Sequence, residues 1–499
     1  MKRREFIKSL SLVTAAVTFP HFSCSQKIHT KKPNIIYILA DDLGYGELGC
    51  YGQKKIRTPN IDKLATEGMR FTQHYSGSPV CAPSRCTLMT GKHTGHAYIR
   101  GNDEMRERGD VWHDPNLEGQ RPLPEGTLTI GKLMQKAGYI TGAIGKWGLG
   151  WTGSTGDPNK QGFDFFYGYN CQRVAHNYYP THLWRNDKKE MLEGNKHFFS
   201  HQKFPKDKDP NNPKSYEPYK GKDYALDFLA AESLNFIKEN QDRPFFLYLP
   251  FIVPHVALQV PEDSLNEYKD VFPEKPYNGE RGYLPHPTPR AAYAAMITRM
   301  DREIGKIMNL LKKLGLDENT LVMFSSDNGA TFQNVGGADP AFFESNSPLR
   351  GFKQDVYEGG IRVPMIARWK GKIEAGSTSN HISAFWDIMP TLAELTGADS
   401  PDEIDGISFL PTLFGKSKKQ QPHKYLYWEY ARRKQAVRMG DWKAVRLSPK
   451  REIELYNLKN DIGEKNNIAL KHPEFVAEMR EIMKEGRTES ELFPLNRDE

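Results

Sequence analysis

The stretch NIIYILADD, residues 34–42, is a run of apolar residues that ends in two carboxylates. Three further runs have the same form: YITGAIG is followed by Lys146, PFFLYLPFIVP by His255, and TLVMFSS by Asp327 and Asn328. Helical patterns lie between these runs, and the alternation predicts an α/β domain with a mostly parallel central sheet between helices. Ligands of open α/β sheets bind beyond the carboxyl ends of the strands. We therefore expect the four polar ends to meet at one site.

This expected site is rich in oxygen ligands. Three carboxylates and one amide would gather there, from Asp41, Asp42, Asp327 and Asn328. Carboxylates at such short range repel one another unless a cation neutralises them, and an all-oxygen set selects calcium or magnesium over zinc. We predict calcium, because its coordination tolerates ligands from separate strands. One Asp after a strand is more often a turn or helix-cap residue, so the prediction depends on the agreement of the strand ends.

The segment SGSPVCAPSRCTLMTGKHTG predicts a helix whose first turn contains Pro83 and which ends at Gly91. Cys81 would then lie at the positive end of the helix dipole, with Arg85 one turn further on. Together with the cation, this environment would stabilise a tetrahedral oxyanion such as sulfate or phosphate. The segment alone is equally consistent with Cys81 as a small buried cysteine, even one paired with Cys86.

Length and composition limit the class of protein. The chain has 499 residues, enough for one large domain and a smaller one. The formal net charge is +7, but lysines and arginines are scattered along the sequence, so we predict no nucleic-acid partner. Four cysteines remain after residue 24, too few and too irregularly spaced for a disulfide scaffold or a zinc cluster.

The first residues, 1–26, predict a bacterial export signal. A basic MKRREFIK precedes an apolar SLSLVTAAVTF and a polar SCSQ. The apolar run is too short to span a membrane. Cys24 is a candidate lipid-anchor site, although His21 and Phe22 fit the usual cleavage pattern poorly. We therefore expect either a periplasmic protein or a lipoprotein that is anchored to the membrane at Cys24.

The remaining chain divides into two parts. The alternation of apolar runs and helical patterns continues to about residue 415, which gives a large domain over 33–415. In 416–499, YLYWEY, KQAVRMG, WKAVRL and IELYNL predict an antiparallel sheet, and HPEFVAEMREIMKEG predicts a helix. Within the large domain, 151–220 is a long insertion with little periodicity. Its aromatic, amide and basic residues suit a sugar ring, so Arg173 and His176 are candidate substrate contacts.

These motifs resemble those of the type I sulfatases, the formylglycine-dependent family of the alkaline-phosphatase-like superfamily. The signature C-x-P-S-R is present as CAPSR at residues 81–85 and continues into LMTGK. ADDLGYG, SSDNG and PLRGFKQDVYEGGIRVP also resemble the family pattern, over residues 33 to about 415. The resemblance implies an alkaline-phosphatase-like fold. It also implies that a maturating enzyme binds transiently and oxidises Cys81 to formylglycine.

The resemblance further implies a mechanism and roles for single residues. The hydrated aldehyde of formylglycine attacks the sulfur of a sulfate ester, displaces the hydroxyl of the substrate and then expels sulfate. Arg85 would hold the hydrate, while Lys146 and Lys353 would bind sulfate oxygens. His255 would protonate the leaving oxygen. The modified Cys81 would join the four oxygen ligands of the calcium or magnesium ion.

One position departs from the family pattern. The family usually has G-K-W-H-L-G after the third strand, with a histidine thought to act as base in sulfate release. This chain has GKWGLG, with Gly148 in that place. His176, His93 and His96 are candidates for a replacement imidazole, but histidines in such positions are more often substrate contacts or packed residues. We expect His176 to contact the substrate.

The sequence therefore predicts a sulfatase that acts on a sulfated carbohydrate. One alternative is a formylglycine-dependent phosphonate or phosphodiester hydrolase, but such relatives usually carry an Asp-His pair where this chain has SSDNG. Another alternative is a non-catalytic binder of sulfated glycans, suggested by the glycine at position 148.

Maturation of Cys81 gives the first prediction. In protein made with a competent maturase, the tryptic peptide from Phe71 to Arg85 should carry formylglycine, which is lighter than cysteine because sulfur is lost and oxygen gained. Mass spectrometry of that peptide measures the change. Recovery of unmodified Cys81 alone from a fully active enzyme would contradict the mechanism. Cys81→Ala should lose turnover but keep the fold.

Overall fold

The computed structural model describes residues 32–495, apart from 109–113, 115–116 and 400. The export signal predicted for residues 1–26, with Cys24, lies outside the described residues. Among the helices of the described part, none combines the length and the apolar character that crossing a membrane requires.

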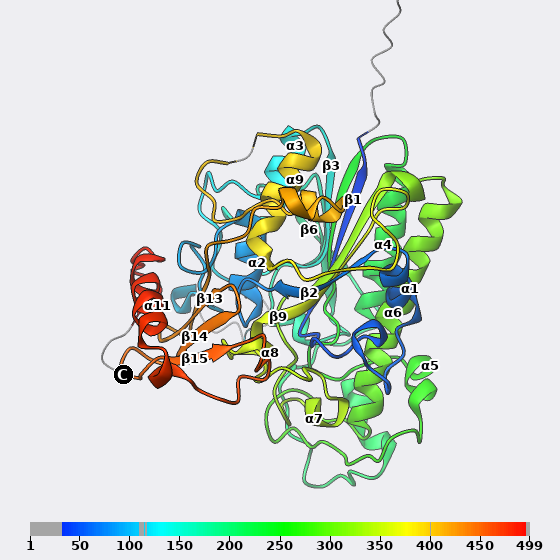
Figure 1. The fold of residues 1–499 in the computed structure, drawn as a ribbon. Coiled ribbons are helices and arrows are strands. Elements are labelled where there is room, and N and C mark those ends of the chain that lie inside the picture. Colours follow the sequence, from blue (N-terminus) through cyan, green and yellow to red (C-terminus); the bar gives the residue numbers. More distant parts are fainter. Residues whose placement is uncertain (1–31, 109–113, 115–116, 400, 496–499) are drawn as a thin grey trace, which may run out of the picture. The chain divides into compact units, whose positions relative to one another are not determined.

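A mixed, mostly parallel sheet of eleven strands forms the centre of the described chain (Figure 1). Ten of its strands follow one another in space in this order: β10 (Ser377–Ser379), β2 (Met69–Tyr75), β9 (Arg362–Arg368), β8 (Thr320–Ser326), β1 (Asn34–Ala40), β7 (Phe245–Pro250), β3 (Ile140–Lys146), β4 (Phe165–Tyr169), β5 (His182–Arg185) and β6 (Lys188–Met191). The eleventh strand, β11 (Ser383–Ala384), pairs with β2.

The middle of this sheet confirms the predicted fold class. Strands β8, β1, β7, β3 and β4 are parallel neighbours, and four of them are the apolar runs that end in polar residues. Ala40 of β1 is in register with Ser326 of β8. The next residues of the two strands, Asp41 and Asp327, therefore lie side by side. The carboxyl ends therefore converge as the sequence predicts.

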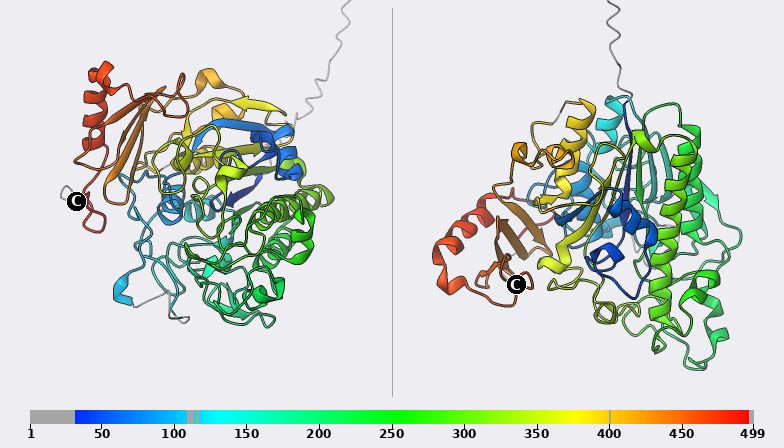
Figure 2. Two further views of the ribbon diagram at one scale, coloured as in Figure 1. Left: turned by 90° about the horizontal axis from the view of Figure 1, so that it is seen from below. Right: turned by 45° about the vertical axis from the view of Figure 1, so that its right-hand side comes forward.

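Strand β1 shows why these runs are continuously apolar. All seven of its residues are buried, because helices cover both faces of the sheet (Figure 2). Side chains of a strand alternate between faces. Ile36 and Ile38 pack against α1 (Pro59–Thr66), α4 (Ala225–Glu239) and α6 (Pro289–Lys313). Ile35 and Leu39 pack against α2 (Cys81–Thr90), α3 (Ile130–Lys136) and α9 (Ile388–Thr396).

Shorter helices complete the large domain. Four of them have four residues each and lie in the connections between strands: α5 (Glu262–Leu265), α7 (Pro340–Phe343), α8 (Glu358–Ile361) and α10 (Leu410–Leu413). Helix α8 directly precedes β9, and the connection before it carries Lys353.

Helix α2 carries the signature cysteine at its first residue. The helix begins at Cys81, two residues before Pro83, so the proline is the third helical residue. Its missing N–H is still one of those that a first turn leaves unsatisfied. Gly91 ends the helix with φ of 68°, as predicted. Cys81 and Cys86 are free thiols, so the structure does not contain the disulfide that the sequence left open.

The insertion at 151–220 is more regular than its sequence indicates. It contains β4, which extends the central sheet in parallel with β3, followed by the antiparallel strands β5 and β6. These strands have only four or five residues, too few to show periodicity. Part of the aromatic segment therefore packs into the sheet.

The C-terminal part contains the small sheet that the sequence predicts. Strands β12 (Leu426–Tyr430), β13 (Lys434–Met439), β14 (Trp442–Arg446) and β15 (Glu454–Asn457) are antiparallel neighbours in that order. Helix α11 (Pro473–Glu485) packs on this sheet through Met479 and Met483. The described residues between 32 and 495 group as one compact unit, so the domain boundary at residue 415 stays a prediction.

A buried ion network joins the small sheet to the large domain. Lys443 of β14 lies 2.9 Å from a carboxylate oxygen of Glu358 in α8 and 2.9 Å from one of Glu464, and all three side chains are fully buried. Glu358 also accepts hydrogen bonds from Tyr75 and Arg362. Burial and the neighbouring Glu358 raise the pKa of Glu464 to about 7. One lysine therefore holds two buried carboxyl groups together.

Removing this lysine should destabilise the protein. Lys443→Met leaves Glu464 buried without its cation, while Glu358 keeps Arg362, and breaking such a buried pair typically costs about 3–5 kcal/mol. Urea titration followed by fluorescence measures the apparent free energy of unfolding. Lys450→Met, on an exposed lysine, is the control and should change stability by less than ~0.5 kcal/mol. Equal midpoints for the two variants would show that the network does not stabilise the fold.

Candidate active site

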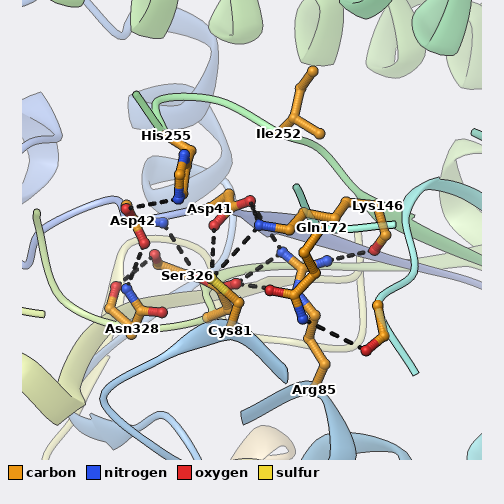
Figure 3. A network of polar contacts seen from close by, with 12 residues as sticks. Asp41, Asp42, Cys81, Arg85, Lys146, Gln172, Ile252, His255, Ser326 and Asn328 are labelled. Carbon is orange, nitrogen blue, oxygen red and sulfur yellow. Dashed lines mark hydrogen bonds and ion pairs between the residues drawn. The ribbon is translucent and has the colours of Figure 1, made fainter. Parts of the chain in front are cut away.

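The predicted site residues lie at one edge of the central sheet (Figure 3). Asp41 and Asp42 follow β1, Lys146 ends β3, and Asp327 and Asn328 follow β8. Cys81 begins α2, and Arg85 lies one turn further along that helix. The loop after β7 supplies His255, and the connection before α8 supplies Lys353. Residues that are far apart in the sequence are thus brought around the Cys81 side chain.

Each carboxylate of the site has a basic partner. Asp41 Oδ2 lies 2.6 Å from Lys146 Nζ, and Asp42 Oδ2 lies 2.8 Å from Lys353 Nζ. Asp327 Oδ2 accepts hydrogen bonds from Arg85 Nε and Nη2, at 3.1 and 2.8 Å. The three carboxylates are almost completely inaccessible to solvent. Burial opposes ionisation, but the charge of Lys146 above all holds the pKa of Asp41 well below its usual value.

Cys81 lies between the two lysines. Its Sγ is 3.5 Å from Lys146 Nζ, 3.7 Å from Lys353 Nζ and 3.5 Å from an oxygen of Asp41. Burial and the Asp41 carboxylate raise the pKa of the Cys81 thiol to about 12. An unmodified thiol would therefore stay protonated at neutral pH and be a poor nucleophile.

His255 is oriented by two hydrogen bonds. Its Nδ1 bonds to the backbone carbonyl of Val256, so this nitrogen carries a proton. Its Nε2 lies 3.1 Å from Lys353 Nζ and accepts a hydrogen bond from that ammonium group. Burial and the charge of Lys353 lower the pKa of His255 to about 4. The imidazole is therefore neutral, with Nε2 turned toward the site.

The donor atoms of the site fit a divalent cation. Asp41, Asp42, Cys81 and His255 each offer a ligand atom, and these atoms lie within 4.8 Å of one another. Asn328 donates from Nδ2 to Asp42, at 2.7 Å, while its buried Oδ1 has no hydrogen-bond donor among the described residues.

The charges of the site also favour a cation. Burial and the Asp41 carboxylate raise the pKa of Asp327 to about 6. This repulsion between buried carboxylates is what a cation would relieve, and the acceptor of Asn328 would be satisfied by it.

The two candidate substrate contacts lie on the His255 side. His176, at the end of a 3₁₀ turn (Val174–His176), stacks on His255 with ring centroids 4.4 Å apart and an interplanar angle of 12°. Arg173 directly precedes this turn, and its Nε is 2.6 Å from an oxygen of Glu104. His93 and His96 instead stack on each other and contact Asp405.

The space beside Gly148 is filled by Gln172. Gly148 has φ of 80°, and a Cβ at this position would lie 2.5 Å from Gln172 Nε2 and 2.7 Å from its Cγ. Gln172 is 4% exposed, and its backbone N–H donates to Gln120 at 2.7 Å. Figure 3 shows Gln172 on the Lys146 side of Cys81, opposite His255. Sequence reasoning missed Gln172, because nothing in the segment NCQRVAH marks it.

Comparison with known proteins decides the family. The sequence pattern of the family described as "Sulfatase" matches residues 33–398, about three quarters of the chain. The chain belongs to the sulfatase family. A second pattern, described as "N-sulphoglucosamine sulphohydrolase, C-terminal", matches residues 352–489 of the sulfatase. The protein is therefore a sulfuric ester hydrolase of the alkaline-phosphatase-like superfamily.

Individual relatives agree with this assignment. The sulfatase is 31% identical to human steryl-sulfatase over 454 residues, which cover 79% of this chain and 72% of that protein. It is 30% identical to the N-acetylgalactosamine-6-O-sulfatase of Bacteroides thetaiotaomicron, and the match covers 93% of this chain and 96% of that protein. The crystal structure of Ps i-CgsB superposes with a TM-score of 0.72 at 31% identity, and the match covers 91% of this chain and 92% of that one.

The packing of Gln172 on Gly148 gives a prediction for stability. Gly148→His should lose about 2–5 kcal/mol, because it places a β-carbon in the left-handed region and overpacks a buried side chain. The double variant Gly148→His with Gln172→Gly should recover the part of the stability loss that is due to overpacking. Urea titration measures both variants.

Gly153→His is the control for backbone strain in this experiment. Gly153 has φ of 89°, but a β-carbon there meets nothing within 4 Å. Gly153→His should therefore lose less stability than Gly148→His. If the losses of Gly148→His and of Gln172→Gly, each measured alone, simply add in the double variant, Gln172 does not occupy the space of a side chain at position 148.

Proposed function

We propose that this sulfatase hydrolyses a sulfate ester of a sulfated carbohydrate, using a formylglycine made from Cys81 and a bound calcium ion, or magnesium in its place. One observation carries the proposal. The Cys81 side chain lies in a buried site between two ammonium groups, at 3.5 and 3.7 Å, and beside three carboxylates. Such a site combines places for a nucleophile, a cation and an anionic substrate group.

The cation would be held by Asp41, Asp42, Asp327, Asn328 and the modified residue 81. Calcium is our choice because the donors come from two strand ends and one helix start, and its coordination geometry is flexible. When both groups are present, the aldehyde hydrate supplies the nucleophilic oxygen and the cation increases its acidity. We assign His255 to proton transfer, because its Nε2 is turned toward the site and lies 3.1 Å from Nζ of Lys353, a group that would bind sulfate.

Lys146 and Lys353 would bind and orient the sulfate group, and Arg85 would hold the hydrate. Although burial opposes their charge, neighbouring carboxylates raise the pKa of Lys146 and Lys353 above the usual value, so both are cationic at neutral pH. The N-terminus of α2 adds the positive end of a helix dipole at Cys81. Fixed positive groups of this kind stabilise the charge that develops on a sulfuryl group during transfer.

His255 would protonate the oxygen of the leaving hydroxyl. A bound sulfate ester adds negative charge beside the imidazole, and this charge favours a proton on Nε2. Because Nδ1 is tied to the Val256 carbonyl, Nε2 is held toward the site and donates its proton to the departing oxygen. Once Nε2 carries this proton it cannot accept from Lys353, so the ammonium group, 3.1 Å away, would donate to a sulfate oxygen instead.

The carbohydrate would lie on the His255 side, against His176 and Arg173. His176 stacks on His255, so a group attached to the leaving oxygen would come close to it. Two relatives support a sulfated sugar: one is the N-acetylgalactosamine-6-O-sulfatase of Bacteroides thetaiotaomicron, and Ps i-CgsB was solved in complex with k-i-k-neocarrahexaose. The start of the sequence supports export from a bacterial cell, with Cys24 as the candidate anchor site.

A phosphonate or phosphodiester hydrolase remains the second candidate. A phosphonate monoester hydrolase of Agrobacterium radiobacter shares the fold, with a TM-score of 0.59 at 20% identity. The Asp327-Asn328 pair argues against this chemistry, since the sequence resemblance implies an Asp-His pair in such enzymes.

A panel of defined sulfated mono- and oligosaccharides tests the proposed activity. The matured protein should release sulfate from at least one of them and leave a phosphonate monoester and a phosphodiester largely unchanged. Cys81→Ala should release none. Faster hydrolysis of the phosphorus esters would favour the second candidate. Binding of sulfated sugars without release would indicate a glycan-binding protein.

The cation gives a separate prediction. Elemental analysis should find about one calcium or magnesium ion per chain and no stoichiometric zinc. Asp327→Ala removes one buried ligand, so metal content and sulfate release should fall together. Asp263→Ala, which removes a carboxylate that pairs with Arg299 at the surface, is the control and should keep both. Full activity in a metal-free Asp327→Ala variant would refute the proposed cation site.

A further inference from the structure

A series of rings leads from His255 to the surface. His176 stacks on His255, which is 2% exposed, and Tyr283 lies 5.3 Å from His176 between ring centroids. His201 lies 5.9 Å from His176 and 4.3 Å from Tyr283, and its side chain is exposed. The rings therefore line the outward path from the leaving-group side of the site. Neither His201 nor Tyr283 was singled out from the sequence.

An open pocket adjoins this series of rings. The pocket is open to the solvent and encloses about 80 Å³. The pocket is lined by residues that precede and follow His176 in the sequence and by residues that precede His201. Among them are Arg173, Asn177, Thr181, His182, His197 and Phe199. Aromatic rings with a few hydrogen-bonding groups are the usual lining of a small-molecule site.

Two basic groups of this pocket already have acidic partners, and Asp114 adds a carboxylate to its lining. Arg173 Nε lies 2.6 Å from Glu104, and His182 Nε2 lies 2.6 Å from Glu118. A second sulfate would need a cation that is available to it, whereas hydroxyl groups need only neutral donors and acceptors. Asn177 and Thr181 offer such groups. The pocket therefore suits an uncharged ligand.

The aromatic wall of the pocket is anchored. Phe198 packs against the buried residues Tyr216 and Leu284, while its neighbour Phe199 is 43% exposed and lines the pocket. Gln202 donates from its backbone to the carbonyl of Tyr283 at 3.4 Å, and Phe204 donates to that of Asn278 at 2.8 Å. An exposed phenyl ring that is held in this way presents a flat apolar face without a large loss of entropy on binding.

We propose that this pocket is a second sugar subsite, which takes an uncharged sugar residue linked to the sulfated one. The proposal deepens the proposed function and rests on it: His255 and His176 would face the sulfated sugar, and Phe199, Asn177 and Thr181 the next residue. The enzyme would accordingly act on oligosaccharides in preference to monosaccharides.

The test compares three substrates of the matured enzyme. One is the best sulfated monosaccharide of the panel, and the other two are disaccharides that carry the same sulfated sugar linked, at one end or the other, to an uncharged hexose. One disaccharide should have the higher kcat/KM. Phe199→Ala should lower the ratio of kcat/KM for disaccharide over monosaccharide about tenfold, mainly through KM. Tyr98→Ala, also 43% exposed but outside the pocket, is the control and should keep the ratio.

Calorimetry with the inactive Cys81→Ala protein separates binding from turnover. The favoured disaccharide should bind more tightly than the monosaccharide, and Phe199→Ala in that background should remove the difference. Equal affinity for the two sugars, or an unchanged ratio in Phe199→Ala, would overturn the subsite. Preference for a disaccharide with a second sulfate would overturn its uncharged character. If no sulfated sugar is hydrolysed at all, the proposed function fails, while the calorimetry still decides whether the pocket binds a second sugar.

Discussion

The balance of buried charge at the sheet edge is the constraint on which the rest of the structure depends. Three carboxylates are withdrawn from water there, and each is matched by a basic group: Asp41 by Lys146, Asp327 by Arg85 and Asp42 by Lys353. Without these partners, burial of the carboxylates would be prohibitive. The charges of the three pairs sum to zero. A bound divalent cation would therefore give the site a net charge of +2, which suits an anionic substrate group.

The fold meets this constraint by bringing partners together from distant parts of the chain. The parallel order β8, β1, β7, β3 places four strand ends side by side, and α2 directs its N-terminus at the same point. Lys353 comes from a connection just before α8, and Glu358 in α8 is held by Lys443 of the small C-terminal sheet. The C-terminal part thus stabilises the segment that supplies one of the three basic groups.

The two sides of Cys81 differ in chemical character. On one side, stacked imidazoles and Tyr283 lead outward to a pocket with paired charges. On the other side, the neutral amide of Gln172 covers Gly148. An amide donates and accepts hydrogen bonds but does not titrate near neutral pH. In the proposed mechanism, proton transfer would therefore be concentrated on the His255 side, where the leaving group would depart.

The sequence by itself determined the strands, because runs such as residues 34–40 must be buried on both faces, and the helix at Cys81, because Gly91 provides its end. The strand ends and the signature also located the carboxylates, the lysines and His255. Only the tertiary structure decided that Gln172 fills the space at Gly148 and that His176 stacks on His255. These residues lie on irregular loops, where neighbours are set by non-local packing that no periodic pattern encodes.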